Sequence, residues 1–600
     1  MKVLLAAINA KYIHSNLAVY SLRAYAQKYE DAVRIAEYTI NQPVDEILMD
    51  IYGRRPDILC ISCYLWNISY VKQIITEIPK VLPDVKIWLG GPEVSYNAPQ
   101  LIEEYSGIAG VMCGEGEETF LELLEYYESA MKSEGGSSEK DGGFGRAYTL
   151  SDEYLSAGLA KIRGLVYRGP GGNVNETVPR PALDLSTVPF PYARIEDFKN
   201  RIIYYESSRG CPFSCSYCLS SIDKCLRFRD IGLVKKELQF FIDHEVPQVK
   251  FVDRTFNCRH DHAAAVWNYI KEHDRGITNF HFEIAADLLN EEEMELIRSM
   301  RPGLIQLEIG VQSANSRTIC EINRKMDLQK VERVTAKLRE KRNVHQHLDL
   351  IAGLPYEDYE SFGRSFDCVY AMRPQQLQLG FLKVLKGSAM HERTREYGLV
   401  YQERPPYEVL STKWLSYADI IRLKKIEEMV EVYYNSGQFE NTMRRLCQEY
   451  SSAFSMYSAL ADFYEENGLF GRSHSRTARY EILLHFIERC VGAEAKKVEE
   501  YREQLTLDLY LRDNVGNRPH FLGESRVSRE EASDFYRTEA EEFRYLKGYE
   551  GYDRNQLRKM THLERLGGRL LLFDYRSRDC LTGNAKVYFI DSRPDKAERE

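Results

Sequence analysis

Three cysteines of this chain have the spacing of metal ligands. Cys211, Cys215 and Cys218 stand in the run RGCPFSCSYC, a C-x3-C-x2-C arrangement that directly follows an expected strand. Three thiolates can hold three irons of a cubane and leave the fourth iron open to a chelating molecule. A structural zinc site is the alternative, but it normally takes four ligands in separated pairs, and no second C-x2-C pair follows downstream. The spacing of Cys225 from Cys218 fits no zinc knuckle.

Six strand patterns, each followed by a helical pattern, surround this motif and end near Lys386. Six such units suit a partial (β/α) barrel, whose active site lies at the C-terminal mouth. Because the cysteines follow the first strand, we expect them at that mouth. The strand patterns are IIYYES, VKFVD, FHFEIA, IQLEIGV, HQHLDLIAG and QLQLGFLKV.

The first part of the chain has a different strand–helix alternation with a shorter period. Continuous apolar runs separated by amphipathic segments indicate strands covered on both faces, hence a doubly wound parallel sheet of about five strands. A ligand of such a sheet sits beyond the carboxyl ends of the strands, which here carry small and polar residues. Their glycines suit both a close ligand and ordinary turns. The runs are VLLAAI, VRIAEY, DILCISCY, KIWLGG and GVMCGE.

The fold class is therefore α/β, with a mainly helical final part. A Gly- and Ser-rich stretch at Ser133–Gly145 indicates a linker, Ile162–Tyr167 a strand, and the turn Thr582-Gly583-Asn584 a closing hairpin. Long helical segments are expected at Ala418–Asn435, Phe439–Asn467 and Thr477–Leu505. We divide the chain into a Rossmann-like domain at 1–130, a connecting region at 131–198, a partial barrel at 199–388 and a helical domain at 389–600.

The composition narrows the class of protein. The formal net charge of −10 provides no global basic field for nucleic acid, and no apolar stretch suits a signal peptide or a membrane helix. The 13 cysteines are an odd number without a secretory signal, so a disulfide framework is not expected. We expect a cytoplasmic enzyme that does not bind membranes.

With Tyr217 before its last cysteine, the motif resembles that of the radical S-adenosylmethionine (SAM) superfamily, over about residues 200 to 390. In that family the amino and carboxylate groups of SAM chelate the open iron of a [4Fe-4S] cluster, and one electron cleaves SAM to a 5'-deoxyadenosyl radical. The run VDRTFN departs from the family's usual Gly-Gly-Glu. The resemblance implies SAM contacts by Tyr217, Asp253, Arg254, Glu308, Gln312, Ser313, Asp349, Gly353 and Leu354.

The doubly wound domain is similar to the cobalamin-binding domains that precede many such barrels. It lacks the Asp-x-His-x-x-Gly motif that ligates cobalt, so we expect cobalamin to bind without histidine on the metal. His14 is the nearest imidazole, but its place before a helix is more typical of a polar helix-start residue. The resemblance implies cobalamin contacts by Asn9, Lys11, Tyr12, His14, Ser62, Tyr64, Trp66, Asn67, Gly90, Gly91, Pro92, Glu93, Gly114, Glu115 and Gly116.

The first functional hypothesis is a cobalamin-dependent radical methyltransferase acting on an unactivated carbon, with an electron donor such as flavodoxin or ferredoxin. The alternatives are a cyclase or rearrangement enzyme with the same cofactors, a cobalamin-binding module, and a nucleic-acid-modifying enzyme. For the last, the run RYLKGY at 544–549 could meet RNA, although a charged surface explains such runs more often. The region from about 390 to 600 resembles an uncharacterised extension of a subset of these proteins, expected to close the barrel mouth.

Overall fold

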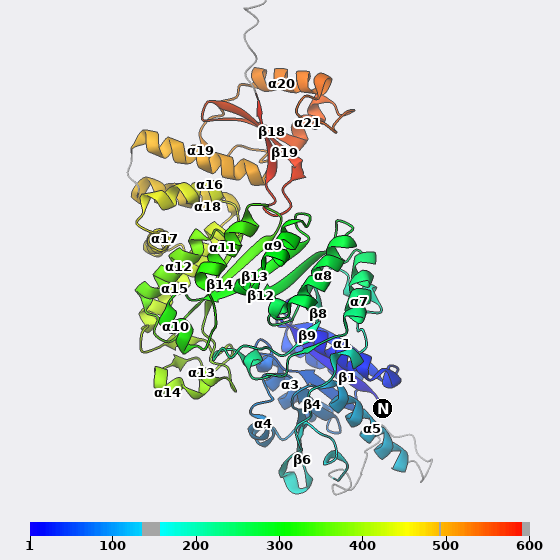
Figure 1. Cartoon of the computed structure of the whole chain (residues 1–600). Coiled ribbons are helices and arrows are strands. Elements are labelled where there is room, and N and C mark those ends of the chain that lie inside the picture. The colour runs from blue at the N-terminus through cyan, green and yellow to red at the C-terminus, as the bar shows by residue number, and fades with distance from the viewer. Residues whose placement is uncertain (135–156, 491–493, 591–600) are drawn as a thin grey trace, which may run out of the picture. The chain divides into compact units, whose positions relative to one another are not determined.

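The chain is shown in Figure 1 as a computed structural model that describes residues 1–134, 157–490 and 494–590. It divides into two compact units. The first comprises Met1–Glu308, Ile319–Asp327 and Phe381–Lys413, and the second comprises Ile309–Thr318, Leu328–Gly380 and Trp414–Glu600. The linker expected at Ser133–Gly145 falls almost wholly outside the described residues.

The first unit begins with a seven-stranded sheet in the order β2-β1-β3-β4-β5-β6-β7. Strands β1 to β5 are parallel, as expected from their apolar runs. Helices α2, α3 and α4 pack on one face through an apolar core, while Trp88 of β4 donates to Tyr127 of α5. The elements are β1 (Val3–Asn9), α1 (Leu17–Tyr25), β2 (Val33–Thr39), α2 (Val44–Arg54), β3 (Ile58–Ser62), α3 (Ile68–Val81), β4 (Lys86–Gly90), α4 (Ala98–Glu104), β5 (Ile108–Met112) and α5 (Glu117–Glu134).

Two more strands extend this sheet beyond the five expected. Strand β6 (Leu165–Arg168) pairs antiparallel with β5, and β7 (Val174–Glu176) pairs antiparallel with β6. The strand expected at Ile162–Tyr167 is therefore found as β6. One sheet therefore contains strands from both sides of residue 130, where the sequence analysis placed a domain boundary.

The six strands expected for the partial barrel all form. In the first unit their order is β8-β11-β12-β13, and β13 continues into the second unit, where the order is β13-β14-β15. Along β13 buried Leu307, Ile309 and Val311 alternate with half-buried positions. One face of the strand therefore packs into the core, and the other carries the polar side chains. The strands are β8 (Ile203–Tyr205), β11 (Gln248–Phe251), β12 (Asn279–Ile284), β13 (Ile305–Gln312), β14 (His345–Ala352) and β15 (Gln376–Phe381).

Helices and short strands accompany the barrel strands. The pair β9 and β10 brackets the cysteine loop and is antiparallel. The elements are β9 (Ser208–Arg209), β10 (Arg227–Phe228), α7 (Ile231–Asp243), α8 (His260–Glu272), α9 (Glu291–Arg298), α10 (Ser316–Glu321), α11 (Leu328–Arg339), α12 (Tyr359–Ala371), α13 (Ala389–Glu392), α14 (Thr394–Tyr397), β16 (Val400–Tyr401) and β17 (Val409–Ser411).

The rest of the second unit is mainly helical and ends in an antiparallel sheet β18-β19-β20, which contains the expected hairpin. The continuous helical segment expected over Phe439–Asn467 is wrong: the backbone is extended at Tyr450, and Ser452 starts a new helix with a capping box. Among the described residues no helix combines the length and apolarity needed to cross a bilayer. The elements are α15 (Tyr417–Val430), α16 (Glu440–Leu446), α17 (Ala453–Glu466), α18 (Arg476–Cys490), α19 (Ala495–Arg512), α20 (Arg529–Glu542), α21 (Arg554–Met560), β18 (Thr561–Leu566), β19 (Arg569–Arg578) and β20 (Ala585–Ile590).

Candidate active site

The three cysteines of the motif lie on one loop directly after β9. Cys211 and Cys215 are buried and Cys218 is half-buried, and all three are free thiols. Burial raises the pKa of Cys211, and the neighbouring thiols of Cys218 and Cys215 raise it further. Gly210 before them has φ +92, and a side chain there would meet the carbonyl oxygen of Cys225 at 2.7 Å. Three free thiols on one loop, two of them buried and one half-buried, are the ligand type that an iron–sulfur cluster takes.

The backbone of this loop is fastened on both sides. The Ser221 hydroxyl donates to the carbonyl oxygens of Cys215 and Cys218 at 2.9 and 2.6 Å. Ser216 donates its N–H to Ile322 at 3.0 Å and accepts from the N–H of Met390 at 2.8 Å. The thiol positions are therefore set by main-chain contacts to three different segments of the first unit.

Arg324 is a buried cation beside the cysteines that the sequence did not single out. Its Nη1 lies 3.8 Å from the Sγ of Cys215 and 3.3 Å from the hydroxyl of Tyr217. It stands on the segment between α10 and α11, more than a hundred residues from the motif, so no local pattern marks it. A guanidinium here offers donors to a carboxylate next to the cluster ligands.

Asp253 is fully buried just after β11, and its carboxylate accepts hydrogen bonds from two serines. Its carboxylate accepts from the N–H and hydroxyl of Ser207 at 3.0 and 2.7 Å and from the hydroxyl of Ser208 at 2.5 Å. Burial raises the pKa of Asp253 to about 6, against the lowering effect of these donors. Of the two neighbours in its motif, Arg254 is exposed, and Thr255 lies 3.9 Å from the Sγ of Cys211. Asp253 thus holds the strand that leads into the cysteine loop.

The cysteine loop is tied to the carboxyl edge of the N-terminal sheet by charge. Arg209, two residues before Cys211, donates to Glu115 at 2.8 Å and to Glu117 at 2.9 Å. Arg227 also donates to Glu115, at 2.8 Å. These ion pairs bring the loop after β5, where cobalamin contacts were expected, next to the cluster loop within the first unit.

The other expected cobalamin residues gather at the same edge, after β1, β3 and β4. Gly91 has φ +114, and a side chain there would meet the carbonyl oxygen of Cys63 at 2.5 Å, so only glycine fits. Glu93 is not open to solvent: it accepts from Tyr407 and lies 3.8 Å from Lys386. Lys11, Tyr12, Pro92 and Gly114 are exposed, whereas Ser62, Gly90 and Gly116 are half-buried.

Two aromatic side chains form a platform at this edge. The rings of Tyr64 and Trp66 are stacked at 4.5 Å with an interplanar angle of 5°, and Trp66 is 45% exposed. The Trp66 indole donates to Ile8 at 3.0 Å, while Asn67 links Ile8, Ser62 and Tyr64. A broad, flat and partly apolar surface fixed by hydrogen bonds fits a large planar macrocycle.

The imidazole of His14 is hydrogen-bonded to the first strand of the partial barrel. Its Nδ1 lies 2.7 Å from the hydroxyl of Tyr204 on β8, and the bridge between His14 and Ile202 docks the loop on that strand. Burial lowers the pKa of His14, as do Lys11 and Lys250. Asn9 supports the loop by donating to the His14 carbonyl at 3.0 Å and to Glu37 at 2.9 Å. Glu37, an acid inside the apolar strand β2, was the one signal in the sequence that such a network exists.

Glu308 on β13 is part of an ion-pair cluster inside the first unit. Lys250 and His281 each lie 3.0 Å from its Oε2. Burial raises the pKa of Glu308, but these two neighbours outweigh it and bring the pKa to about 2. Lys250 is in register with Tyr204 on one side and His281 on the other, so the three form a row across β8, β11 and β12.

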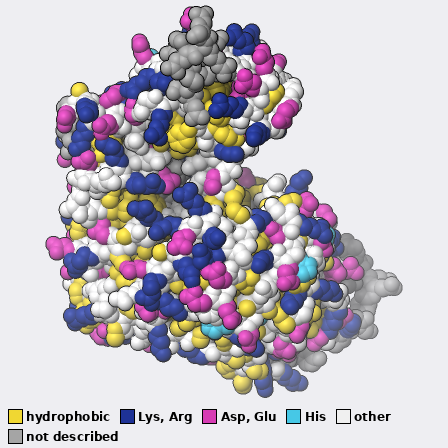
Figure 2. Space-filling view, turned by 45° about the horizontal axis from the view of Figure 1, so that its top comes forward, with side chains coloured by type: hydrophobic (Ala, Val, Ile, Leu, Met, Phe, Trp, Pro, Cys, Tyr) yellow, Lys and Arg dark blue, Asp and Glu magenta, His cyan; other side chains and the backbone are white. Residues whose placement is uncertain are grey.

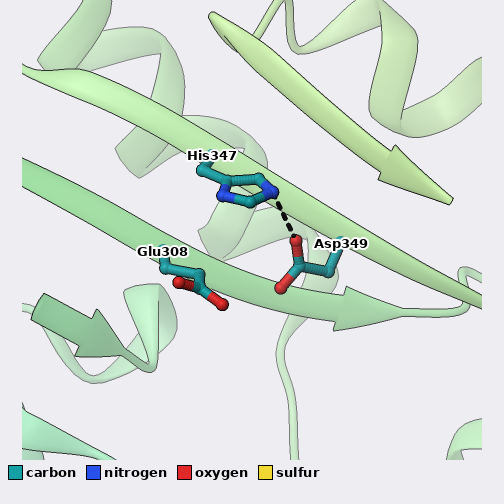
Figure 3. A group of neighbouring side chains, drawn as sticks. All are labelled: Glu308, His347 and Asp349. Carbon is teal, nitrogen blue, oxygen red and sulfur yellow. Dashed lines mark ion pairs between the residues drawn. The ribbon is translucent and has the colours of Figure 1, made fainter. Parts of the chain in front are cut away.

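In the second unit, the expected SAM residues stand at or directly after the end of β13, on β14, and directly after β14. Asp349 pairs with His347 at 3.0 Å, the dashed contact of Figure 3, and Gly353 with φ +92 and buried Leu354 follow. Gln312 has φ +72, unusual for a residue with a side chain, and its buried Oε1 has no hydrogen-bond partner among the described residues. A strained residue with an unsatisfied buried oxygen indicates a missing ligand.

Ser313 points to a buried acid that the sequence did not single out. Its hydroxyl donates to Glu357 at 2.6 Å, and the Ser365 hydroxyl donates to the same oxygen at 2.7 Å. Burial raises the pKa of Glu357 to about 7, although the two serines lower it. This neutralisable carboxyl holds the end of β13 to the loop after β14.

Three parts of the chain match known protein families. Residues 3–124 match the B12 binding domain, residues 205–369 the radical SAM superfamily, and residues 395–579 a family described as "Protein of unknown function (DUF4080)". The chain therefore carries a region that matches the B12 binding domain ahead of a region that matches the radical SAM superfamily. Its cofactors are those the sequence predicted: a [4Fe-4S] cluster, SAM and cobalamin.

Curated relatives include both methyltransferases and cyclases. The chain is 24% identical over 418 residues to the cobalamin-dependent radical SAM methyltransferase TokK of Streptomyces tokunonensis, covering 64% of this chain and 56% of the relative. It is 22% identical over 348 residues to the anaerobic magnesium-protoporphyrin IX monomethyl ester cyclase of Rubrivivax gelatinosus, covering 56% of this chain and 58% of the relative. The matches thus span little more than half the length of these relatives.

A solved structure shares the fold over most of the chain. The cobalamin-dependent SAM radical enzyme OxsB, with aqua-cobalamin and SAM bound, aligns with a TM-score of 0.54 and 14% identity over 84% of this chain and 79% of OxsB. The identity is low, so the likeness is one of fold. It agrees with the expected order of a Rossmann-like domain followed by a partial barrel.

Proposed function

We propose that this cobalamin-dependent radical SAM enzyme methylates an unactivated carbon of its substrate. The observation that carries the proposal is the bridge from Arg209 to Glu115 and Glu117, because it ties the cluster loop to the cobalamin edge of the sheet. Two cofactors held on adjoining loops can act on one substrate in a shared cavity. The TokK relative, a methyltransferase by name, supports the choice of reaction.

The roles of the chain's own residues follow from their positions. We assign the cluster to Cys211, Cys215 and Cys218, and the carboxylate of SAM to the guanidinium of Arg324. Gln312, with its unsatisfied oxygen, is assigned to a donor group of SAM. When bound, the cluster and SAM supply the radical that removes a substrate hydrogen, and cobalamin supplies the methyl group.

We propose that no histidine of this chain would ligate the metal of cobalamin. The Nδ1 atom of His14 is hydrogen-bonded to the Tyr204 hydroxyl, and this contact fixes the imidazole ring on the barrel strand. The proposed cobalamin surface is instead the stacked pair of Tyr64 and Trp66, with Gly91 allowing close backbone approach.

Radical SAM enzymes need a reductant, and we propose a one-electron carrier such as flavodoxin or ferredoxin. The test is anaerobic reconstitution with iron, sulfide and hydroxocobalamin, followed by absorption spectra and an assay for 5'-deoxyadenosine. Trideuteromethyl-SAM added with a metabolite extract then distinguishes the reactions: methyl transfer adds a deuterated methyl group to a product. Products without that label, in the presence of SAM cleavage, would establish the cyclase or rearrangement alternative that the second relative supports.

A further inference from the structure

A cavity of about 1270 Å³ lies wholly within the second unit, and its lining includes arginines and tyrosines. One wall is formed by the loops that precede β14 and β15, and the other by α16 and the end of α19. Gln312 and Gly353, assigned or expected near SAM, follow the carboxyl ends of β13 and β14, so this cavity lies at the opposite end of these strands. Its volume exceeds the range of about 300–1,000 Å³ typical of small-molecule sites.

The two strand-preceding loops are locked together. Gln375 donates its N–H to the carbonyl oxygen of Gln346 at 3.0 Å, and its side chain accepts from the Gln346 N–H at 2.8 Å. Arg339 of α11 donates to the carbonyl oxygen of Met372 in the next loop. The side chains that these loops carry are therefore held next to one another.

Arg342 and Arg373 occupy equivalent places in these two loops. Both have left-handed backbones, with φ of 47° and 52°, where glycine is the usual residue after a helix. Neither has a carboxylate partner among the described residues. A cation near a helix C-terminus is worth about 0.3–1 kcal/mol by itself, which does not explain why both loops carry an arginine in the position that glycine favours.

The carboxylates around the cavity are already used. Asp367 accepts from the N–H of Phe454 at 2.7 Å, Glu440 pairs with Arg444, and Asp579 accepts from the N–H of Thr582 at 2.7 Å. Glu340 also lines the cavity, so its lining contains four carboxylates beside the five arginines Arg339, Arg342, Arg373, Arg444 and Arg512.

Arg512 on the opposite wall adds to the positive charge. It donates to the carbonyl oxygens of Ser436 and Thr582, and burial lowers its pKa, as do the nearby Arg476 and Arg578. The arginines of the lining outnumber its carboxylates by one, and Arg342, Arg373 and Arg512 offer donors from both walls. In Figure 2, dark blue Lys and Arg side chains on this face of the molecule are interspersed with magenta Asp and Glu side chains.

The cavity also has an aromatic and apolar side. The rings of Tyr370 and Tyr434 lie 5.3 Å apart, and the hydroxyl of Tyr434 is fixed on the carbonyl oxygen of Pro374 at 2.5 Å. Met443 and Ala453 complete this side. Arginines pair with phosphate oxygens, and tyrosine and methionine suit a flat ring.

We propose that this arginine cavity binds a phosphate-bearing ligand with a flat ring, of nucleotide size. The site is separate from the cofactors and does not depend on the reaction proposed above. It gives the C-terminal extension a role of its own: together with the loops that precede two barrel strands, the extension forms a binding site.

The test uses the full-length protein and the fluorescent nucleotide trinitrophenyl-ATP, with saturating S-adenosylhomocysteine present to block the SAM site. We expect saturable binding that ATP and pyrophosphate displace. The double variant Arg342→Gln/Arg373→Gln should bind at least about tenfold more weakly, since two charge-assisted contacts are lost. The Arg342→Lys/Arg373→Lys variant should retain part of the affinity, and Arg537→Gln on exposed α20 should bind like the parent.

Thermal unfolding and cobalamin binding of each variant verify that the chain remains folded. Equal affinity of the parent and the double glutamine variant, or absence of saturable binding, overturns the proposal. So does a single-stranded RNA of about 20 nucleotides that displaces the probe at concentrations far below those of ATP, because the ligand would then be a nucleic acid. None of these outcomes bears on SAM cleavage, so this proposal and the proposed function fail separately.

Discussion

Two loop regions next to the expected cofactor residues are held by opposite kinds of interaction. The cysteine loop of the first unit is tied by permanent charges, through Arg209 and its partners Glu115 and Glu117. The end of β13 in the second unit is tied by hydroxyls that meet one buried acid, Glu357, whose pKa is about 7. The first arrangement is insensitive to pH near neutrality, whereas the second changes its charge there. The chain thus uses a fixed fastening, made of ion pairs that keep their charge, and a titratable fastening, made by a carboxyl that changes its charge near neutral pH. Substitutions can test this contrast.

The largest effect is expected from the cluster loop itself. Cys215→Ala removes one of three thiolates, and a cubane cannot be held by the two that remain with an open iron corner still available. We expect SAM cleavage to fall at least about 1000-fold and the iron–sulfur absorption to be lost. Exposed Cys225, only seven residues from Cys218, is the matched control, and Cys225→Ala should retain both. A Cys215→Ala variant that still forms 5'-deoxyadenosine would refute the assignment.

The charged fastening can be broken at Arg209. Arg209→Met leaves Glu115, Glu117 and Glu206 together with little compensation, and a half-buried cluster of this kind should lose about 2–3 kcal/mol of stability. Hydroxocobalamin affinity should fall as well, because the loop after β5 loses its anchor. The surface pair of Arg54 and Asp50 provides the comparison: Arg54→Met should cost no more than about 1 kcal/mol.

Titration calorimetry with hydroxocobalamin and thermal unfolding at fixed pH measure both quantities. If Arg209→Met and Arg54→Met behave alike in cobalamin binding, the bridge does not organise the cobalamin edge.

The titratable fastening predicts a pH dependence. The pKa of Glu357 is about 7 in the folded chain, above its unfolded value, so the folded state retains a proton that the unfolded state has lost. Its contribution to stability is complete below about pH 4.5 and is lost as the pH rises towards 7, by up to roughly 3 kcal/mol. Glu357→Gln should remove this part of the dependence.

Thermal unfolding of both proteins from pH 5 to 8 checks the sign. The difference between variant and parent should grow in favour of the variant as the pH rises. The Glu360→Gln variant, on the surface of neighbouring α12, should follow the parent across this range. A parent and a Glu357→Gln variant with parallel profiles would show that the buried carboxyl does not titrate near neutrality.

The two fastenings also differ in how far the sequence revealed them. The strand runs predicted the fold and the cysteine spacing indicated an iron–sulfur cluster, because hydrophobic period and ligand number are local properties. SAM and cobalamin were implied by the family resemblance. The roles of Arg324 and Glu357 could not be predicted from the sequence, because they arise from contacts between distant segments. The helical segment expected across Tyr450 failed for a local reason, because the capping preference of Ser452 overrides the apolar period. Glu37 was visible as a charge inside an apolar strand, but its partners Asn9 and Tyr20 become apparent only after folding.

The smallest effect is expected at Gln312, the strained residue of the titratable region. Glycine at φ +72 relieves a left-handed backbone, so Gln312→Gly should raise stability by about 1 kcal/mol despite the flexibility it adds to the unfolded chain. The same change deletes the side-chain oxygen that has no partner, and the apparent affinity for SAM should fall several-fold. The matched variant Arg55→Gly, at φ +47 after α2, should raise stability without changing SAM affinity. A gain in stability at both positions with unchanged SAM affinity would mean that the strain at Gln312 serves the strand end alone, and that its side chain holds no cofactor.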